Sequence, residues 1–182
     1  MIAKCGTVII GYGGMGGWHT QQLKTMEEIN LLGVYDILPG RNLLAEEKGL
    51  HAYSSFEEVL NDPQVDLVTV AIPNDQHRDV CIQAMEAGKN VICEKPFTST
   101  VEEFDRLVKE AQDRHLYLFE AIVTAHMPNY LRMKEELPRL GTIRMVQCNF
   151  SQYSSRYDKF LQGETPNVFN PEFSGGALAD IN

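Results

Sequence analysis

The stretch that decides the fold is Thr7-Val8-Ile9-Ile10, followed directly by Gly11-Tyr12-Gly13-Gly14-Met15-Gly16. The first four residues are rich in β-branched side chains, which favours a strand. The glycines match the pattern G-x-G-x-x-G, and a helical stretch follows them. In that context the first glycine permits a tight turn, the second lets backbone approach a pyrophosphate, and the third lets helix pack on strand. Free N–H groups at the helix N-terminus then face the phosphates, so this loop predicts a dinucleotide site.

From this loop onward, apolar β-branched runs alternate with helical patterns. The sequence predicts strands at 7–10, 31–36, 66–72, 90–93 and 116–119, separated by helices at 18–29, 41–48, 55–60, 75–87 and 100–114. Such alternation indicates a parallel sheet with helices on both faces, joined by right-handed crossovers. The predicted fold class is therefore α/β, a doubly wound Rossmann sheet.

The alternation stops near residue 120. A helix is expected at 128–137, a β-rich stretch at 142–153, and a loop rich in Ser, Gly, Pro and Asn at 154–176. We expect residues 1–122 to form the dinucleotide-binding domain. Residues 123–182 would then be the start of a second α/β domain with an open sheet, thin for a core of its own.

The composition excludes several classes of protein. With 16 Lys and Arg against 25 Asp and Glu, the net charge of −9 argues against binding nucleic acid or anionic membrane. No apolar run of about 18 residues suits a membrane helix, so the cytoplasm is the expected compartment. The four cysteines lack metal spacing and are interpreted as small buried residues in a reducing compartment, so no metal site is expected: Cys5, Cys81, Cys93 and Cys148.

Two residues bear on the choice of dinucleotide. Asp36 ends the second predicted strand, 20 residues past Gly16. A carboxylate there can accept hydrogen bonds from the ribose hydroxyls and repels a 2′-phosphate, which favours NAD. Arg41, five residues on, could pair with that phosphate, so NADP stays open.

The remaining candidates follow later strands, because ligands of such sheets bind beyond the carboxyl ends of the strands. Ile72, Pro73, Asn74 and His77 follow the third strand, although Asn74 could simply cap a helix and His77 could lie exposed on its surface. Lys95 follows the fourth strand. A lysine held near a pocket floor loses hydration, which lowers its pKa and suits it to exchange a proton with a substrate hydroxyl or carbonyl. Composition alone fits a surface lysine before a turn equally well.

Four motifs occur together in a familiar order. They are the glycine loop, Ala71-Ile72-Pro73-Asn74-Asp75-Gln76-His77, Glu94-Lys95-Pro96, and Gly175-Gly176-Ala177-Leu178-Ala179-Asp180. Over the whole chain the sequence resembles the glucose–fructose oxidoreductase, inositol dehydrogenase and rhizopine catabolism family (Gfo/Idh/MocA). Asp180-Ile181-Asn182 is also similar to the branch with the dimeric dihydrodiol dehydrogenases.

The resemblance implies an NAD(P)-dependent oxidoreductase acting on an alcohol of a sugar, cyclic polyol or diol. Lys95 would be the catalytic lysine with a cis bond to Pro96, and Asp180 an active-site acid near the substrate. Glu94, Asn74 and His77 would lie around the cofactor. The C-terminal sheet would support a homo-oligomer. Members of the family are longer, and in the dihydrodiol dehydrogenase branch a tyrosine is expected four residues after the Asp. We therefore expect this chain to be a C-terminally truncated fragment of doubtful activity.

Three alternatives stay open. A methyltransferase could use the glycine loop and Asp36, but Glu94-Lys95-Pro96 would have no role there. A non-catalytic dinucleotide sensor could share the fold, since fold does not fix function. In the segment where many relatives carry an arginine, His126 could contact substrate or merely close a loop.

Overall fold

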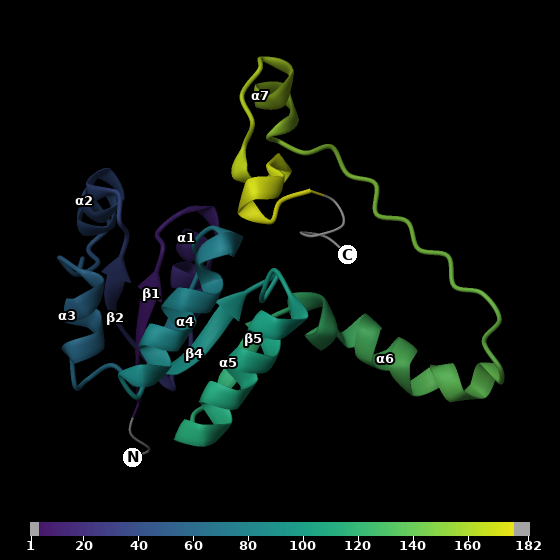
Figure 1. Cartoon of the computed structure of the whole chain (residues 1–182), viewed down its shortest axis with the longest axis horizontal. Coiled ribbons are helices and arrows are strands. Elements are labelled where there is room, and N and C mark those ends of the chain that lie inside the picture. Colours follow the sequence, from purple (N-terminus) through teal and green to yellow (C-terminus); the bar gives the residue numbers. More distant parts are fainter. Residues whose placement is uncertain (1–3, 177–182) are drawn as a thin grey trace.

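The structure is a computed structural model that describes residues 4–176 of the 182-residue chain (Figure 1). Its strands are β1 (Cys5–Ile10), β2 (Ile29–Tyr35), β3 (Leu67–Val70), β4 (Asn90–Glu94) and β5 (Leu118–Ala121). Its α-helices are α1 (Gly14–Leu23), α2 (Pro39–Glu47), α3 (Phe56–Asn61), α4 (His77–Glu86), α5 (Val101–Arg114), α6 (Pro128–Glu136) and α7 (Tyr157–Leu161). Short 3₁₀ turns lie at η1 (Asn74–Gln76), η2 (Val123–His126), η3 (Leu137–Leu140), η4 (Asn167–Phe169) and η5 (Pro171–Phe173).

The five strands form one parallel sheet in the order β2-β1-β3-β4-β5. The chain reverses its direction of winding between β1 and β3, and such switch points are where α/β sheets bind ligands. Beyond β2 a single parallel bridge joins Val34 to Ala52, so this edge carries only a rudiment of a further strand. The predicted doubly wound parallel sheet is confirmed.

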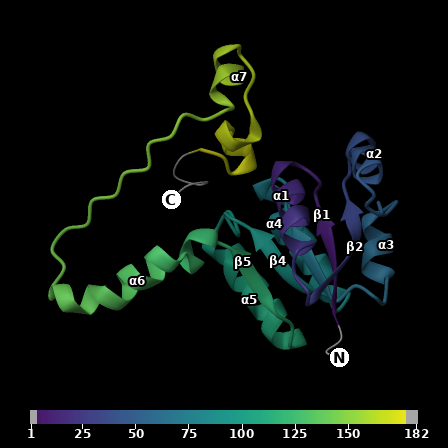
Figure 2. The same cartoon turned by 180° about the vertical axis from the view of Figure 1, so that it is seen from behind.

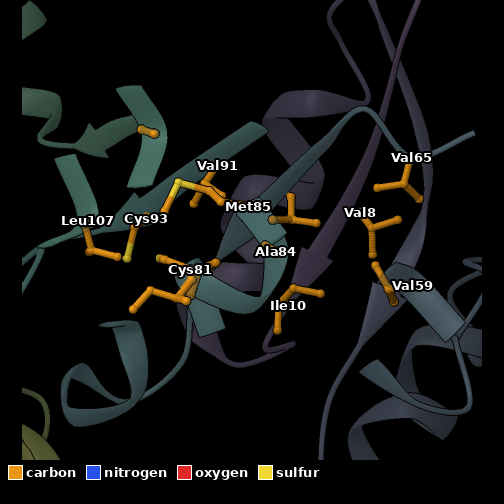
Figure 3. Close-up of a cluster of buried hydrophobic side chains, with 14 of the residues drawn as sticks. Val8, Ile10, Val59, Val65, Cys81, Ala84, Met85, Val91, Cys93 and Leu107 are labelled. Atoms are coloured by element: carbon orange, nitrogen blue, oxygen red, sulfur yellow. The ribbon is translucent and has the colours of Figure 1, made fainter. Parts of the chain in front are cut away.

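The core has two layers because strand side chains alternate between faces. Val8 and Ile10 of β1 pack with residues of α3, α4 and α5, whereas Ile9 between them packs with residues of α1 and α2. Figure 3 shows the first layer, with Val8, Ile10 and Met85 among its labelled members. Burial on both faces explains why the strands read as continuous apolar runs.

Local signals set several helix ends. The side chains of Ser55 and Thr100 cap α3 and α5 by accepting hydrogen bonds from the N–H groups of Glu58 and Glu103. The helix expected at 18–29 instead starts at the glycine loop and ends at Leu23. That expectation was wrong because Ile29 pairs with Cys5 at the start of the sheet, which takes it out of the helix.

The cysteines are only partly as expected. Cys81 and Cys93 are fully buried, but Cys148 is exposed. A hydrogen bond with the Cys81 thiol, together with burial, raises the pKa of the Cys93 thiol. Both residues, labelled in Figure 3, therefore serve as packing groups of the core, and the Cys93 thiol resists ionisation.

The expected β-rich stretch at 142–153 forms no strand in the described part of the chain. Residues 141–153 are all exposed and run as an extended segment away from the sheet (Figures 1 and 2). The sequence has strand-forming side chains there, but a strand is stable only when a neighbour takes its N–H and C=O groups. No segment within residues 4–176 supplies that neighbour, so the start of an open second sheet is not seen.

After this excursion the chain returns to the carboxyl ends of the strands. The Asn74 side chain donates a hydrogen bond to the backbone oxygen of Ser174, with 3.3 Å between Nδ2 and O, and the Ser99 and Ser174 hydroxyls lie 2.5 Å apart. Both views place this last described segment above the end of the sheet. Within residues 4–176 no helix combines the length and apolar character needed to cross a membrane.

Candidate dinucleotide and acid–base site

The glycine loop has the geometry expected of it. Gly11 has a φ of 92°, which other residues rarely adopt, and a side chain there would strike the Ala71 carbonyl. A Cβ on Gly16 would lie 1.9 Å from the Gly11 carbonyl oxygen, so only glycine lets α1 approach β1 this closely. A Cβ on Gly14 would meet nothing within 4 Å, which leaves open space at the N-terminus of α1.

That N-terminus suits an anion. No side chain caps α1 at Gly13, and no acidic residue lies in its first turn. Its N–H groups and the positive end of the helix dipole are therefore available to phosphate oxygens. Met15 is exposed beside this opening, whereas the Tyr12 side chain is buried and serves the core. The residues present fit the pyrophosphate of a dinucleotide.

Asp36 is buried and already has two backbone partners. Its Oδ2 accepts a hydrogen bond from the Tyr12 N–H at 2.8 Å, and its Oδ1 accepts one from the Leu38 N–H at 2.9 Å. Each carboxylate oxygen still has a second lone pair for a ribose hydroxyl. Asp36 thus holds the glycine loop in place, a role that the spacing did not reveal.

Arg41 lies across the same loop. Its Nη1 donates to the Tyr12 carbonyl oxygen at 2.9 Å, and its Nε lies 3.8 Å from Asp36 Oδ2. Its side chain is 44% exposed, so the guanidinium keeps donors facing solvent beside Asp36. The structure therefore places Asp36 and Arg41, the two residues that bear on the choice between NAD and NADP, side by side.

Of the two interpretations of His77, the alternative of an exposed surface histidine is wrong, and a place near the cofactor stays a prediction. Its ring is fully buried, with Nδ1 2.9 Å from the Pro96 carbonyl oxygen and Nε2 3.1 Å from the Ile72 carbonyl oxygen. A neutral ring can donate only one of these hydrogen bonds, while an imidazolium donates both. His77 therefore acts by joining the loop after β3 to the loop after β4. Asn74 and Pro73, half-buried, stay at the edge of the site.

The Lys95–Pro96 bond is cis, as the family resemblance implied. Glu94 is buried at the end of β4, and its Oε2 accepts a hydrogen bond from the Lys95 N–H at 3.2 Å. Lys95 itself is exposed, as in the alternative of a surface lysine before a turn. Its role as an acid–base lysine stays a prediction.

Sequence reasoning missed His19. Its Nε2 lies 2.7 Å from Glu94 Oε1, with side-chain exposures of only 12% and 8%. Residue 19 lies one turn after Gly16, the glycine that faces the sheet, so helical periodicity already placed this polar residue on the sheet side of α1. That position was the available signal.

A cavity of about 370 Å³ lies at the end of β5. Its lining includes Ala121, which pairs with Glu94 across the sheet, and His126. The other lining residues are mostly apolar: Glu120, Ile122, Val123, Met127 and Pro128. His126 lies at the end of η2 and lines this cavity, and contact with a substrate and closure of a loop both stay predictions for it.

Asp180 lies outside the described residues, as does most of the Gly-Gly-Ala-Leu-Ala-Asp run. Among residues 4–176 no group of three or more His, Cys, Asp or Glu side chains is placed to hold a metal ion. The described site therefore consists of the glycine loop, Asp36 with Arg41, the loop after β3, and Glu94-Lys95-Pro96.

Comparison with known proteins agrees with this arrangement. Residues 5–122 match the family model described as "Oxidoreductase family, NAD-binding Rossmann fold" (GFO_IDH_MocA). The chain is 34% identical over 175 residues to scyllo-inositol 2-dehydrogenase (NADP(+)) IolU of Bacillus subtilis (strain 168), covering 95% of this chain and 53% of the relative. It is 37% identical over 132 residues to trans-1,2-dihydrobenzene-1,2-diol dehydrogenase of Sus scrofa, covering 71% and 37%.

A solved structure shows the same fold. The NAD-binding protein from Listeria innocua superimposes with a TM-score of 0.71 at 37% identity, covering 76% of this chain and 41% of that one. The chain thus spans about half, or less, of the proteins it matches. The cofactor expectation, NAD with NADP open, is confirmed at the level of the family, and a methyltransferase loses its basis. The chain belongs to the Gfo/Idh/MocA oxidoreductase family with an NAD-binding Rossmann fold.

Proposed function

We propose that this chain is the dinucleotide-binding part of an NAD(P)-dependent oxidoreductase that acts on an alcohol or carbonyl of a sugar, cyclic polyol or diol. The observation that carries the proposal is a convergence at one sheet edge. The carboxyl ends of β1, β2, β3 and β4 bring together the glycine loop, Asp36, the Ile72–Asn74 loop and Lys95. The names of the relatives, an inositol and a diol dehydrogenase, support the substrate class.

Within this proposal each residue has one task. The N-terminus of α1 binds the pyrophosphate, and Asp36 accepts hydrogen bonds from the adenosine ribose. Arg41 lies beside the same ribose. When bound, the nicotinamide supplies the acceptor or donor of a hydride. Lys95 accepts the hydroxyl proton when an alcohol is oxidised and returns it when the carbonyl is reduced. Asp180 would assist at the substrate.

The cavity beside β5 bears on the substrate range. A polyol needs polar groups around it, whereas a ring diol also presents a hydrocarbon face. The apolar lining around His126 supports the diol part of the proposed range.

The test is dinucleotide reduction with scyllo-inositol, D-xylose and a trans-dihydrodiol. Because this chain spans about half the length of its relatives, turnover is measured on a form that spans their full length, comparing the unchanged protein with Lys95→Met. General acid–base catalysis typically contributes about 10²- to 10⁴-fold, so the variant should lose that much of kcat while binding NADH equally well. Lys24→Met, on the exposed end of α1, is the matched control. A full-length form that binds NADH but turns over none of these alcohols would favour the dinucleotide sensor.

A further inference from the structure

The His19–Glu94 pair joins the two halves of the proposed site. His19 projects from α1, whose N-terminus is the phosphate cradle, and Glu94 ends β4 directly before Lys95. With Nε2 and Oε1 2.7 Å apart and both side chains nearly buried, this is a desolvated contact of the kind that fixes geometry. No sequence motif used above includes His19.

Both oxygens of the Glu94 carboxylate are used. Oε1 faces His19, while Oε2 accepts the hydrogen bond from the Lys95 N–H. A continuous path of hydrogen bonds therefore runs from α1 through Glu94 to the backbone of Lys95. Without His19, Glu94 Oε1 would lose its partner among residues 4–176, and the 3.2 Å contact of Oε2 with the Lys95 N–H is a weak one for a buried charge. Leaving a buried carboxylate oxygen without its partner is unfavourable, so the carboxylate is expected to change its orientation.

The chain after Lys95 is held in a similar way. The Pro96 carbonyl oxygen contacts His77, which is buried and also reaches the Ile72 carbonyl oxygen. Lys95 is thus flanked by two histidine contacts, one to the phosphate-binding helix and one to the loop after β3. Of the two, His19 is the better experimental target because its substitution disturbs less buried structure.

We propose that His19 is a positioning residue that sets the Glu94–Lys95 corner relative to α1, so that a dinucleotide seated on α1 finds the lysine in place. The proposal rests on the proposed function, since it assigns Lys95 a position over the bound dinucleotide. It predicts that loss of the His19 contact leaves the dinucleotide bound but the lysine poorly placed against it.

The experiment measures how strongly saturating NADH protects Lys95 from an amine-acylating reagent, by mass spectrometry of the modified peptides with Lys24 as internal reference. Loss of a charge-assisted hydrogen bond should reduce the protection of Lys95 in His19→Leu by a factor of about ten. His19→Gln, whose amide can donate from a similar place, should restore protection to within about threefold. NADH affinity, measured separately by calorimetry, should change little in both variants.

Two further variants make the result decisive. His51 is an exposed histidine beyond β2, so in His51→Leu NADH should protect Lys95 as strongly as in the unchanged chain. If His19→Leu does not fold, Glu94→Gln removes the charge from the pair at constant size and should also lose protection. Equal protection in all folded variants overturns this inference alone, whereas absence of NADH binding in the unchanged chain overturns the proposed function.

Discussion

Residues 5–122 and residues 141–153 contain similar strand-forming side chains, yet only the first region forms a sheet. Val68 of β3 is fully buried, whereas Val146 is 73% exposed in an extended segment. The difference is the presence of partners: β3 has β1 on one side and β4 on the other, and the second region has no partner strand among the described residues. A β-rich sequence therefore predicts a strand only where the chain also supplies its neighbours.

The largest expected effect is on thiol reactivity. Cys81 and Cys93 are buried and the pKa of Cys93 is raised, so an alkylating reagent should reach them only when the sheet opens, roughly a thousandfold more slowly than Cys148. Peptide mass spectrometry after timed labelling measures the three rates. Comparable rates in the native protein would remove the distinction between the two regions.

The second-largest expected effect is on the backbone packing at the glycine loop. Gly16→Ala places a Cβ 1.9 Å from the Gly11 carbonyl oxygen, so we expect a loss of about 3 kcal/mol in the free energy of unfolding, together with loss of dinucleotide binding. A Cβ on Gly17 would meet nothing within 4 Å, and alanine forms helix better than glycine. Gly17→Ala should therefore raise the free energy of unfolding by up to about 1 kcal/mol. Urea unfolding of both variants tests the pair, and equal effects would contradict the close approach of α1 to β1.

Two methionines provide a matched comparison of side-chain packing. Met85 is fully buried in the first core layer and Met145 is 84% exposed. Met85→Ala should cost about 2–5 kcal/mol of stability, and Met145→Ala should stay within about 0.5 kcal/mol. Chemical denaturation followed by circular dichroism gives both values. A substantial cost at Met145 would mean that the extended segment is packed in solution.

The smallest expected effect concerns the whole second region. Removing residues 123–182 should change the free energy of unfolding by no more than about 2 kcal/mol. Residues 141–153 are exposed, and the contacts that the deletion removes include the two hydrogen bonds of Ser174 with Asn74 and Ser99, each worth about 0.5–1.5 kcal/mol. The measurement also tests whether residues 1–122 are a domain. A chain that ends at 122 and no longer folds would place part of the core beyond this boundary.

The sequence was informative where the chemistry is local. The glycine spacing acts on near neighbours, so the tight turn at Gly11 and the close packing of α1 on β1 at Gly16 could be predicted. The hydrogen bond that Asp36 accepts from the Tyr12 N–H could not be predicted, and neither could the burial of His77 against the Pro96 carbonyl oxygen. Both depend on contacts that only the folded chain creates.

The same limit applies to Lys95. An apolar strand before it and a proline after it suit a pocket floor and a surface lysine equally well, because side-chain burial depends on what lies opposite. In the structure Lys95 is exposed. The pair formed by His19 and Glu94 was missed because its members are 75 residues apart. Only the packing of α1 against the end of β4 brings them together.

The most direct test of the central claim is a titration of this chain with NADH and, separately, NADPH, following energy transfer from Trp18 to the reduced nicotinamide. Trp18 is the single tryptophan, 42% exposed, and lies two residues past Gly16 on α1. The account predicts saturable transfer with both ligands, tighter for NADH because Asp36 faces the ribose. Absence of saturable transfer with either would contradict the assignment of the glycine loop as a dinucleotide site.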